Sequence, residues 1–289
     1  MSSEGGFRIA ICGVGLIGGS LGMAWRRAGL AREIVGIGRR PLDEAVRLGA
    51  IDRWVTDPAE GFAKADVIVL GAPVQAIALQ AATHARFVRP GTIVTDVGST
   101  KLAIVKAWEA HLPEGAFFVG GHPLFGRELS GVENATADLS RGCRYVLTTG
   151  ERATPEALEV MRSLAEAAGG IVRVMDPAEH DARVAMASHL PQLVATALAA
   201  TALVSEERVG GVLDLAATGF RDTTRIAGSP ANLWTDIFLT NPIAIRSALL
   251  IFRESLDELE SALERGDAAG IERVFARAHE TRRRLPPRT

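Results

Sequence analysis

The chain has 289 residues, of which 47% are hydrophobic and 23% are charged, a composition typical of a globular protein that buries a substantial core in one or, as we expect, two domains. The formal net charge of −2 gives no general attraction to nucleic acid or to an anionic membrane, so we expect neither as a partner. Small-molecule chemistry is the class of function that remains.

The cysteines and the N-terminal residues favour an intracellular protein. Cys12 lies in an apolar run and Cys143 in the sequence GCRY, which fits neither a disulfide framework nor a metal site, so we expect reduced thiols and no metal. The first residues, MSSEGGF, lack the basic and apolar regions of a signal peptide, which favours the cytoplasm. The most membrane-like stretch, 185–204, is rich in alanine and carries His189 and Gln192, which favours a buried packing helix.

From Arg8 onward, short β-rich runs alternate with longer helical segments. The expected strands are 8–12, 33–37, 66–73, 92–99, 144–149 and 171–175, and the expected helices among them are 16–29, 75–87 and 155–168. This alternation predicts a parallel sheet covered by helices, and strand signals stop after residue 175. We therefore expect an α/β domain over 1–175 and an all-helical domain over 176–289.

A glycine triplet follows the first expected strand. In GVGLIGG, Gly13, Gly15 and Gly18 have the G-x-G-x-x-G spacing, which permits a tight turn, a close approach of a pyrophosphate and packing of the next helix on the sheet. The N-terminus of that helix then faces the phosphates, and a Rossmann-type domain follows as the prediction. A tight turn that binds nothing is the alternative. The residues predicted to bind the cofactor here are Gly13, Gly15, Leu16, Ile17, Gly18, Ala72 and Pro73.

The end of the second expected strand bears on which cofactor binds. An enzyme that prefers NAD places an acidic residue there, whereas this strand ends in Gly38, Arg39 and Arg40. Glycine leaves room for a 2′-phosphate and an arginine pairs with it through a charge-assisted hydrogen bond, so the sequence favours NADP over NAD. Arginines that point into solvent are the alternative.

Residues 120–131, GGHPLFGRELSG, follow no helix or strand pattern and predict a shaped loop. Glycines let a ligand approach the chain closely, and the following proline holds His122 extended. We expect this loop to present its side chains to a ligand.

The second half reads as helices with a polar cluster of its own. The helix expected over 180–204 contains Pro191, which should kink it unless the helix begins there, and His189 and Gln192 share one of its faces. Later, the sequence at 219–237 concentrates arginine, aspartate, threonine and tryptophan. Either its arginines clamp a carboxylate, or Asp222 or Thr223 caps a helix beside exposed charges.

Three stretches together resemble one family: CGVGLIGGS at 12–20, GGHPLFGRELSG at 120–131, and the pair ASHLPQLVA at 187–195 and GFRDTTRIAGSPANLW at 219–234. The chain resembles the prephenate and arogenate dehydrogenases of tyrosine biosynthesis. The resemblance implies a Rossmann-type domain, a helical domain that forms a homodimer, and an active site between the two. It implies the NAD(P)-dependent oxidation and decarboxylation of prephenate to 4-hydroxyphenylpyruvate, or of arogenate to tyrosine.

The resemblance also implies roles for individual residues. His122 would act on the ring hydroxyl as the catalytic base, and Ser99, in DVGSTK, would hydrogen-bond near both this histidine and the nicotinamide, unless it caps the next helix. Arg225 would receive a substrate carboxylate. The other predicted substrate-site residues are His189 and Gln192, then Glu128 and Asp222 in an ionic network at the pocket entrance, and Trp234, which would close the pocket across the dimer interface unless it is plain core.

Some residues depart from the family pattern. Gln192 stands where relatives frequently have histidine, and a neutral amide that donates to a keto acid favours prephenate over arogenate. Phe125 and Arg127 are larger than the residues expected in the loop, and the sequence assigns neither a role.

Two other functions fit parts of the sequence. A β-hydroxyacid dehydrogenase or imine reductase also joins a Rossmann domain to a helical one, but those enzymes rely on a lysine in the helical domain, and residues 176–289 contain none. A nucleotide-sensing scaffold would bind the cofactor without turnover, which the presence of His122, Ser99 and Arg225 disfavours.

Overall fold

The computed structural model describes residues 5–125 and 129–286. Contacts divide the chain into two compact units, the first made of residues 1–181 and 229–240 and the second of 182–228 and 241–289. The chain therefore passes between the units after residues 181, 228 and 240. The single boundary after residue 175 stays a prediction.

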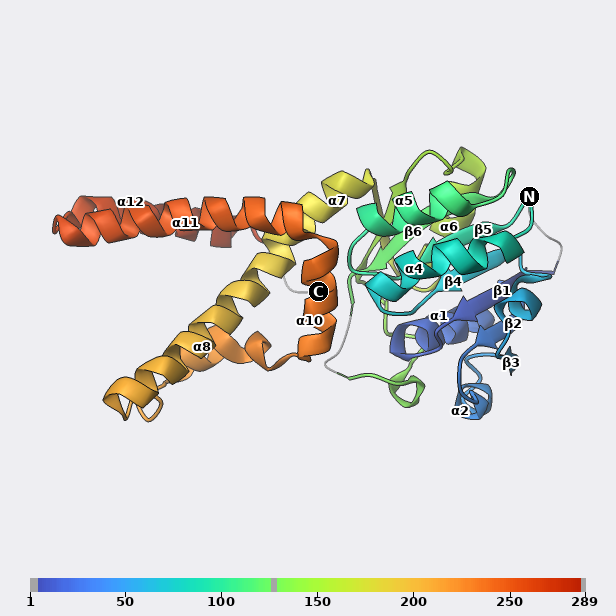
Figure 1. Cartoon of the computed structure of the whole chain (residues 1–289), viewed down its shortest axis with the longest axis horizontal. Helices are drawn as coiled ribbons and strands as arrows, with labels where there is room; N and C mark the ends of the chain where they lie inside the picture. Colours follow the sequence, from blue (N-terminus) through green and yellow to red (C-terminus); the bar gives the residue numbers. More distant parts are fainter. Residues whose placement is uncertain (1–4, 126–128, 287–289) are drawn as a thin grey trace. The chain divides into compact units, whose positions relative to one another are not determined.

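The first unit is built on one eight-stranded sheet with the strand order β3-β2-β1-β4-β5-β6-β7-β8 (Figure 1). Its strands are β1 (Phe7–Cys12), β2 (Ala31–Ile37), β3 (Arg53–Val55), β4 (Val67–Leu70), β5 (Ile93–Asp96), β6 (Phe117–Pro123), β7 (Arg144–Thr149) and β8 (Ile171–Met175). All neighbouring strands are parallel except the antiparallel pair β6 and β7. The order 3-2-1-4-5-6 is that of dinucleotide-binding domains, which confirms the predicted α/β fold.

Hydrophobic side chains alternate between the two faces of the sheet, as the period of two in a strand requires. Ile9 and Ile11 pack on one face against α1 (Leu16–Arg27) and α6 (Pro155–Ala167). Ala10 and Cys12 pack on the other against α3 (Pro58–Phe62), α4 (Val74–His84) and α5 (Leu102–His111). Burial raises the pKa of Cys12 to about 11, so this free thiol stays protonated as a core residue.

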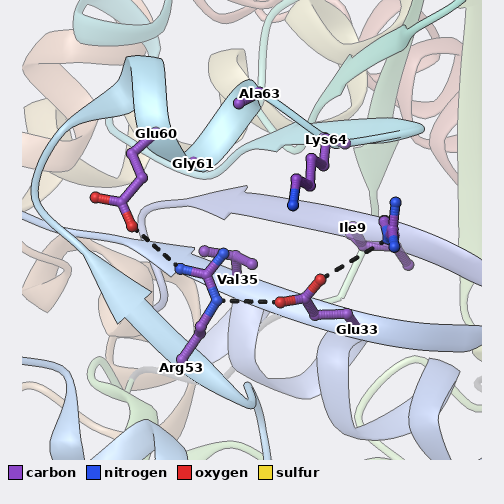
Figure 2. A pocket seen from close by; sticks show the side chains of 10 residues that line it. Ile9, Glu33, Val35, Arg53, Glu60, Gly61, Ala63 and Lys64 are labelled. Atoms are coloured by element: carbon purple, nitrogen blue, oxygen red, sulfur yellow. Dashed lines mark hydrogen bonds and ion pairs between the residues drawn. The ribbon is translucent and has the colours of Figure 1, made fainter.

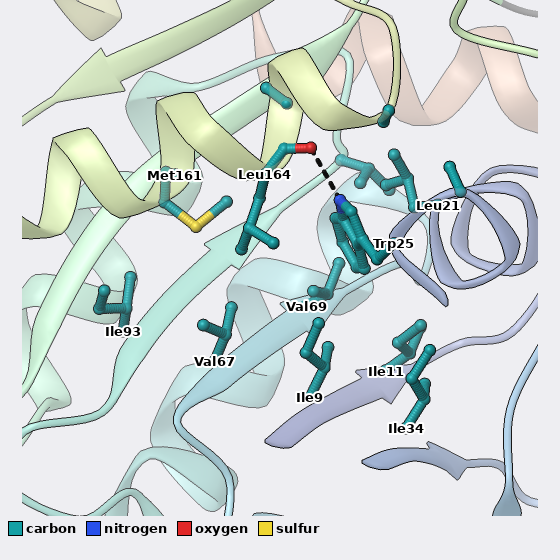
Figure 3. Packing of buried hydrophobic residues seen from close by; sticks show 14 of the residues in the cluster. Ile9, Ile11, Leu21, Trp25, Ile34, Val67, Val69, Ile93, Met161 and Leu164 are labelled. Atoms are coloured by element: carbon teal, nitrogen blue, oxygen red, sulfur yellow. Dashed lines mark hydrogen bonds between the residues drawn. The ribbon is translucent and has the colours of Figure 1, made fainter. Parts of the chain in front are cut away.

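The larger of these cores surrounds Trp25 of α1 (Figure 3). Its ring is buried, and its indole nitrogen donates to the carbonyl of Leu164 at 2.8 Å, which ties α1 to α6. The two bonded residues lie 139 positions apart in sequence, and their helices share one face of the sheet. A buried tryptophan with a satisfied nitrogen fixes both helices on that face.

A network of ion pairs lies at the edge of the sheet where the parallel strands begin (Figure 2). Arg53 pairs with Glu33 at 3.0 Å and with Glu60 at 3.4 Å, and Arg8 approaches Glu33 at 3.9 Å. The pocket that they line is therefore at the opposite edge from the strand ends that bind ligands in such sheets.

The predicted loop at 120–131 was wrong in its first part, because residues 117–123 form β6 inside the sheet. Its glycines are required by packing: a Cβ on Gly120 would lie 2.3 Å from the Thr148 hydroxyl, and one on Gly121 would lie 2.4 Å from the Asp96 carbonyl oxygen. His122 therefore stands on a strand, paired with Val146 of β7.

Short elements connect this framework. They are α2 (Asp43–Arg47), the 3-10 turns η1 (Ala85–Phe87) and η2 (Val132–Asn134), and α10 (Ala231–Thr240), which belongs to the first unit although it lies late in the sequence.

The second unit is helical. It includes the end of α7 (Pro177–Val184), then the π-helical turn η3 (Ala185–His189), α8 (Leu190–Val209), α9 (Thr218–Thr224), the 3-10 turn η4 (Arg225–Gly228), α11 (Pro242–Glu264) and α12 (Ala268–Arg284). α8 begins at Leu190 with Pro191 in its first turn, where the missing N–H is tolerated, and the π-helical turn η3 directly precedes it.

The helical run Pro177–Val209 is long and apolar enough to cross a membrane by length and composition, and 28% of its most apolar window is buried within the chain. The bent pair α10 and α11 passes the same test together. The second unit leaves many large apolar side chains exposed: Leu203, Val209, Leu215, Ile243, Leu250, Ile251, Leu263 and Phe275. Exposed apolar side chains that form a contiguous patch mark an interaction site.

Candidate active site

The glycine triplet forms the turn between β1 and α1. Gly13 has φ +97°, and a Cβ there would lie 2.8 Å from the backbone of Gly71, so this position requires glycine. A Cβ on Gly18 would lie 2.8 Å from the carbonyl oxygen of Gly13, whereas one on Gly15 would meet nothing within 4 Å. The space beside Gly15, before the N-terminal N–H groups of Leu16 and Ile17, therefore fits a pyrophosphate.

A pocket continues from this turn to the end of β2. It is lined by Gly13, Val14, Ile37, Gly38, Arg39, Arg40 and Leu42. Both arginines are exposed, and neither forms an ion pair within residues 5–125 and 129–286. Gly38 packs close to Leu42, which accounts for this glycine without a ligand.

The predicted cofactor residues Ala72 and Pro73 lie directly before α4, at the end of β4. The N-terminus of α4 is capped from a distant part of the chain, because the Asp236 carboxylate accepts from the N–H of Gln75 at 3.2 and 3.3 Å. Thr240, also on α10, accepts from the Thr100 hydroxyl at 3.0 Å. These bonds hold α10, and with it Trp234, on the nucleotide-binding unit.

His122 is 9% exposed and belongs to a hydrogen-bonded series of buried polar groups. Its Nδ1 lies 2.8 Å from Nε2 of His180, and Nδ1 of His180 lies 2.8 Å from Oδ1 of Asp181. The Asp181 carboxylate accepts from the N–H groups of Lys101 at 2.7 Å and Leu102 at 2.9 Å, at the start of α5. Two imidazoles are thus connected to one carboxylate inside the first unit.

A second buried pair fixes the strand beside His122. The Lys101 ammonium contacts the Asp96 carboxylate and donates to the Gly121 carbonyl at 2.7 Å, while Asp96 accepts from the N–H of Gly98 at 2.7 Å. Burial raises the pKa of the Asp96 carboxyl and lowers the pKa of the Lys101 ammonium, and their mutual contact opposes both shifts. The pair therefore holds Gly121, and the histidine after it, at the carboxyl end of β5.

Two further predicted residues, Ser99 and Trp234, also belong to the first unit. Ser99 is half-buried in the turn between β5 and α5, and it does not cap α5, because Asp181 accepts the first N–H groups of that helix. Trp234 is half-buried on α10, with its ring 5.7 Å from that of Phe238.

The second unit brings two predicted residues together. Gln192 is buried on α8, and its amide nitrogen donates to the carbonyl of Ile226 at 2.9 Å, which joins α8 to the turn η4 that begins at Arg225. His189 is buried in η3, where its Nδ1 lies 3.4 Å from the amide nitrogen of Asn241. Arg225 itself is exposed in the single chain.

The structure also bears on the predicted residues around Arg225 and in the segment after β6. The alternative in which Asp222 or Thr223 caps a helix does not hold for α9, because this helix begins at Thr218 and contains both residues. Phe125 follows the end of β6, is half-buried, and packs against the core of the first unit. Glu128 and Arg127 lie outside the described residues.

Sequence reasoning missed His180, Asp181, Lys101 and Asp96. The one available signal was the adjacent His–Asp pair at 180–181, because an imidazole beside a carboxylate is a common catalytic arrangement. The other two are indistinguishable in the sequence from ordinary strand-end and surface charges.

The family model of the prephenate dehydrogenase nucleotide-binding domain matches residues 21–174, and that of the prephenate dehydrogenase dimerization domain matches residues 176–277. The chain belongs to the prephenate dehydrogenase family. Membership in this family confirms the predicted nucleotide-binding domain of an oxidoreductase followed by a helical dimerization domain.

Named relatives cover nearly the whole chain. Prephenate dehydrogenase of Bacillus subtilis is 33% identical over 97% of this chain and 76% of its own length, and cyclohexadienyl dehydrogenase of Zymomonas mobilis is 29% identical over 95% and 94%. The crystal structure of Aquifex aeolicus prephenate dehydrogenase with hydroxyphenyl propionate and NAD+ matches with a TM-score of 0.88 at 32% identity, covering 98% of this chain and 99% of that one. Synechocystis arogenate dehydrogenase matches with a TM-score of 0.84 at 32% identity, covering 95% and 98%.

Proposed function

We propose that this enzyme oxidises and decarboxylates prephenate to 4-hydroxyphenylpyruvate in tyrosine biosynthesis, in the cytoplasm. The observation that carries the proposal is the buried His122, connected through His180 to a carboxylate, on the same unit as the dinucleotide turn at Gly13. Relatives of this family that match most of the chain act, by their names, on prephenate or on cyclohexadienyl substrates.

His122 supplies the proton chemistry of this reaction. A bound nicotinamide cofactor would supply the hydride acceptor for the ring carbon that bears the hydroxyl. His122 accepts the proton of that hydroxyl, so that the carbon–oxygen bond becomes a carbonyl. The bond from the ring to its carboxylate then breaks, its electron pair makes the ring aromatic, and the proton on His122 returns to the phenolate oxygen as CO2 leaves. Ser99, in the turn that follows β5, orients the histidine or the nicotinamide.

Arg225 binds a carboxylate of the substrate, because a guanidinium matches a carboxylate through two parallel hydrogen bonds. Gln192 and His189 line the same substrate site, since Gln192 holds the turn that begins with Arg225. Asp222 and Glu128 contribute to an ionic network at the entrance, and Trp234 closes the pocket.

Steady-state rates test this function directly. Each of prephenate and arogenate is assayed with NAD+ and with NADP+, by the absorbance of the reduced cofactor and by the release of CO2. We expect turnover of prephenate with stoichiometric CO2. Cofactor binding without turnover in all four combinations would indicate the scaffold function instead.

Arogenate is a second candidate substrate, and one observation favours it. From the sequence, we expect the Gln192 amide nitrogen to donate to the keto acid of prephenate. In the structure this nitrogen already donates to the Ile226 carbonyl, and that bond fixes the orientation of the amide. The amide oxygen of Gln192 is a buried atom without a partner among the described residues. An unpaired acceptor is satisfied by a donor such as the ammonium of arogenate, so a lower KM for arogenate than for prephenate would select this candidate.

NADP is the cofactor that we propose over NAD, because the exposed Arg39 and Arg40 line the pocket at the end of β2. Arg39→Ala should raise the KM for NADP+ by about tenfold, the loss of a hydrogen bond to a charged group, and leave the KM for NAD+ nearly unchanged. Arg32→Ala, at the other end of the same strand, is the matched control. Parallel losses for both cofactors would show that Arg39 does not read the 2′-phosphate.

A homodimer is the assembly that we propose, formed through the exposed apolar residues of the helical unit. Ile251 on α11 is 54% exposed, and Ile251→Arg should raise the dimer dissociation constant at least about tenfold, because it places a charge in an apolar interface. Leu79→Arg, 74% exposed on α4 of the first unit, is the control and should leave the mass in sedimentation unchanged. An unchanged dimer dissociation constant in Ile251→Arg would show that Ile251 lies outside the dimer interface.

A further inference from the structure

His180 and Asp181 are both buried, and His180 joins Asp181 to His122. His180 is 1% exposed, which for a titratable side chain calls for a partner at each nitrogen. The structure gives each ring nitrogen of His180 one such neighbour, namely Nδ1 of His122 for Nε2 and Oδ1 of Asp181 for Nδ1, both at 2.8 Å.

For an ionised Asp181 carboxylate and a neutral His180 ring, the hydrogen bonds around these groups determine which nitrogen carries each proton. The ionised Asp181 carboxylate only accepts hydrogen bonds, and it already accepts from the N–H groups of Lys101 and Leu102. Nδ1 of His180 must therefore carry the proton that it shares with Asp181. Nε2 of a neutral His180 is then an acceptor, so the proton between the two rings belongs to Nδ1 of His122.

This assignment decides the tautomer of His122. A neutral imidazole has one N–H and one lone pair, and with Nδ1 protonated the lone pair lies on Nε2. We infer that His180 and Asp181 are positioning residues that hold His122 in the Nδ1–H tautomer, with Nε2 able to take the hydroxyl proton of the substrate. The inference rests on the proposed function of His122 as the base.

The same series of bonds stabilises the protonated state. When Nε2 of His122 takes a proton, the ring becomes an imidazolium whose Nδ1–H points to His180, and the charge is balanced by the Asp181 carboxylate beyond it. His122 gives up this proton in the aromatisation step, so all three side chains return to their initial protonation states at the end of the reaction. Asp181 is in turn held by the start of α5, whose positive dipole end stabilises a carboxylate.

A purely structural role for His180 makes a different prediction. If the side chain only filled space, leucine would replace it as well as glutamine or better, because the site is almost fully buried. If it fixes the tautomer, glutamine should be superior, since its amide oxygen stands near the place of Nε2 and accepts from His122, whereas leucine leaves Nδ1–H of His122 without this acceptor.

The experiment compares His180→Leu with His180→Gln in the full-length enzyme. We expect leucine to lower kcat with prephenate by about 10- to 100-fold and glutamine to recover most of this loss, while the KM for prephenate and for the cofactor changes little in either variant. Heteronuclear NMR of the imidazole nitrogens should find His122 protonated at Nδ1 in the native enzyme and in His180→Gln, and in mixed tautomers in His180→Leu.

Asp176→Ala is the matched control, because Asp176 caps α7 through the N–H groups of Ala178 and Glu179 and its side chain makes no hydrogen bond to the His180 ring. It should lower the melting temperature and leave kcat unchanged. Equal kcat for leucine and glutamine at position 180, or an equal loss in Asp176→Ala, would overturn the inference. If the native enzyme turns over prephenate and kcat falls in His122→Asn but not in His180→Leu, only this inference fails. If the native enzyme does not turn over prephenate, the proposed function fails.

Discussion

Replacing His122 by asparagine is expected to lower kcat with prephenate by about two to four powers of ten, the usual contribution of a general base. Asparagine is the informative substitution because its amide nitrogen stands near the place of Nδ1 and still donates to His180, so that only the basic Nε2 is lost. The KM for the cofactor should not change, since the glycine turn at 13–18 is on another part of the sheet. Steady-state kinetics at saturating cofactor measure the effect.

His111→Asn is the control for this variant, because His111 is exposed at the end of α5 and its ring bonds a carbonyl of its own helix. It should retain full activity. A His122→Asn enzyme with an unaltered rate would remove this imidazole from the role of base and transfer the proton step to another group.

Arg225→Ala is expected to raise the KM for prephenate by about 100-fold with a smaller change in kcat, because a substrate carboxylate loses a charged, two-fold hydrogen-bonded partner. Arg225→Lys should recover only part of the loss, since an ammonium keeps the charge but not the planar fork. The KM for the cofactor reports separately on the nucleotide site and should remain constant.

Arg221→Ala is the matched control, as another exposed arginine in the last turns of the preceding helix α9. Its KM for prephenate should stay within about twofold of the native value if only position 225 binds the carboxylate. Equal apparent affinity for prephenate in the Arg225→Ala and native enzymes would defeat the carboxylate-binding role.

The framework of the first unit followed from the sequence because its signals are local. Apolar strands such as β4 and the glycine spacing at 13–18 reflect contacts within a few residues or a fixed supersecondary unit, and both were predicted. The three-residue β3 is too short to carry a pattern. Strand β6 was predicted as a loop because Gly120 and Gly121 lower its strand signal, and the reason for both glycines is packing against distant residues.

The polar groups around His122 could be predicted only in part, for the same physical reason. The position of His122 in the family motif indicated the base, but its partner His180 is 58 residues away and is brought to it by the fold. Lys101 and Asp96, five residues apart, look like surface charges in the sequence, and only the structure reveals that both are buried in contact. In the second unit, the amide orientation of Gln192 depends on the Ile226 carbonyl, which no local pattern predicts.

Asp181 accepts hydrogen bonds from the first N–H groups of α5, although it lies 80 positions after Lys101 in the sequence. Asp236 likewise accepts from the N–H of Gln75 at the start of α4. Both acceptors lie beyond residue 175, where a polypeptide cut at the predicted domain boundary would end. Such a truncated chain would contain every strand of the sheet but would lack the carboxylates that cap the N-termini of α4 and α5. Losing each cap would lower the free energy of unfolding by about 1 kcal/mol. To express the first unit on its own, a shortened protein must therefore include residues 176–181 and 229–240 as well as the sheet.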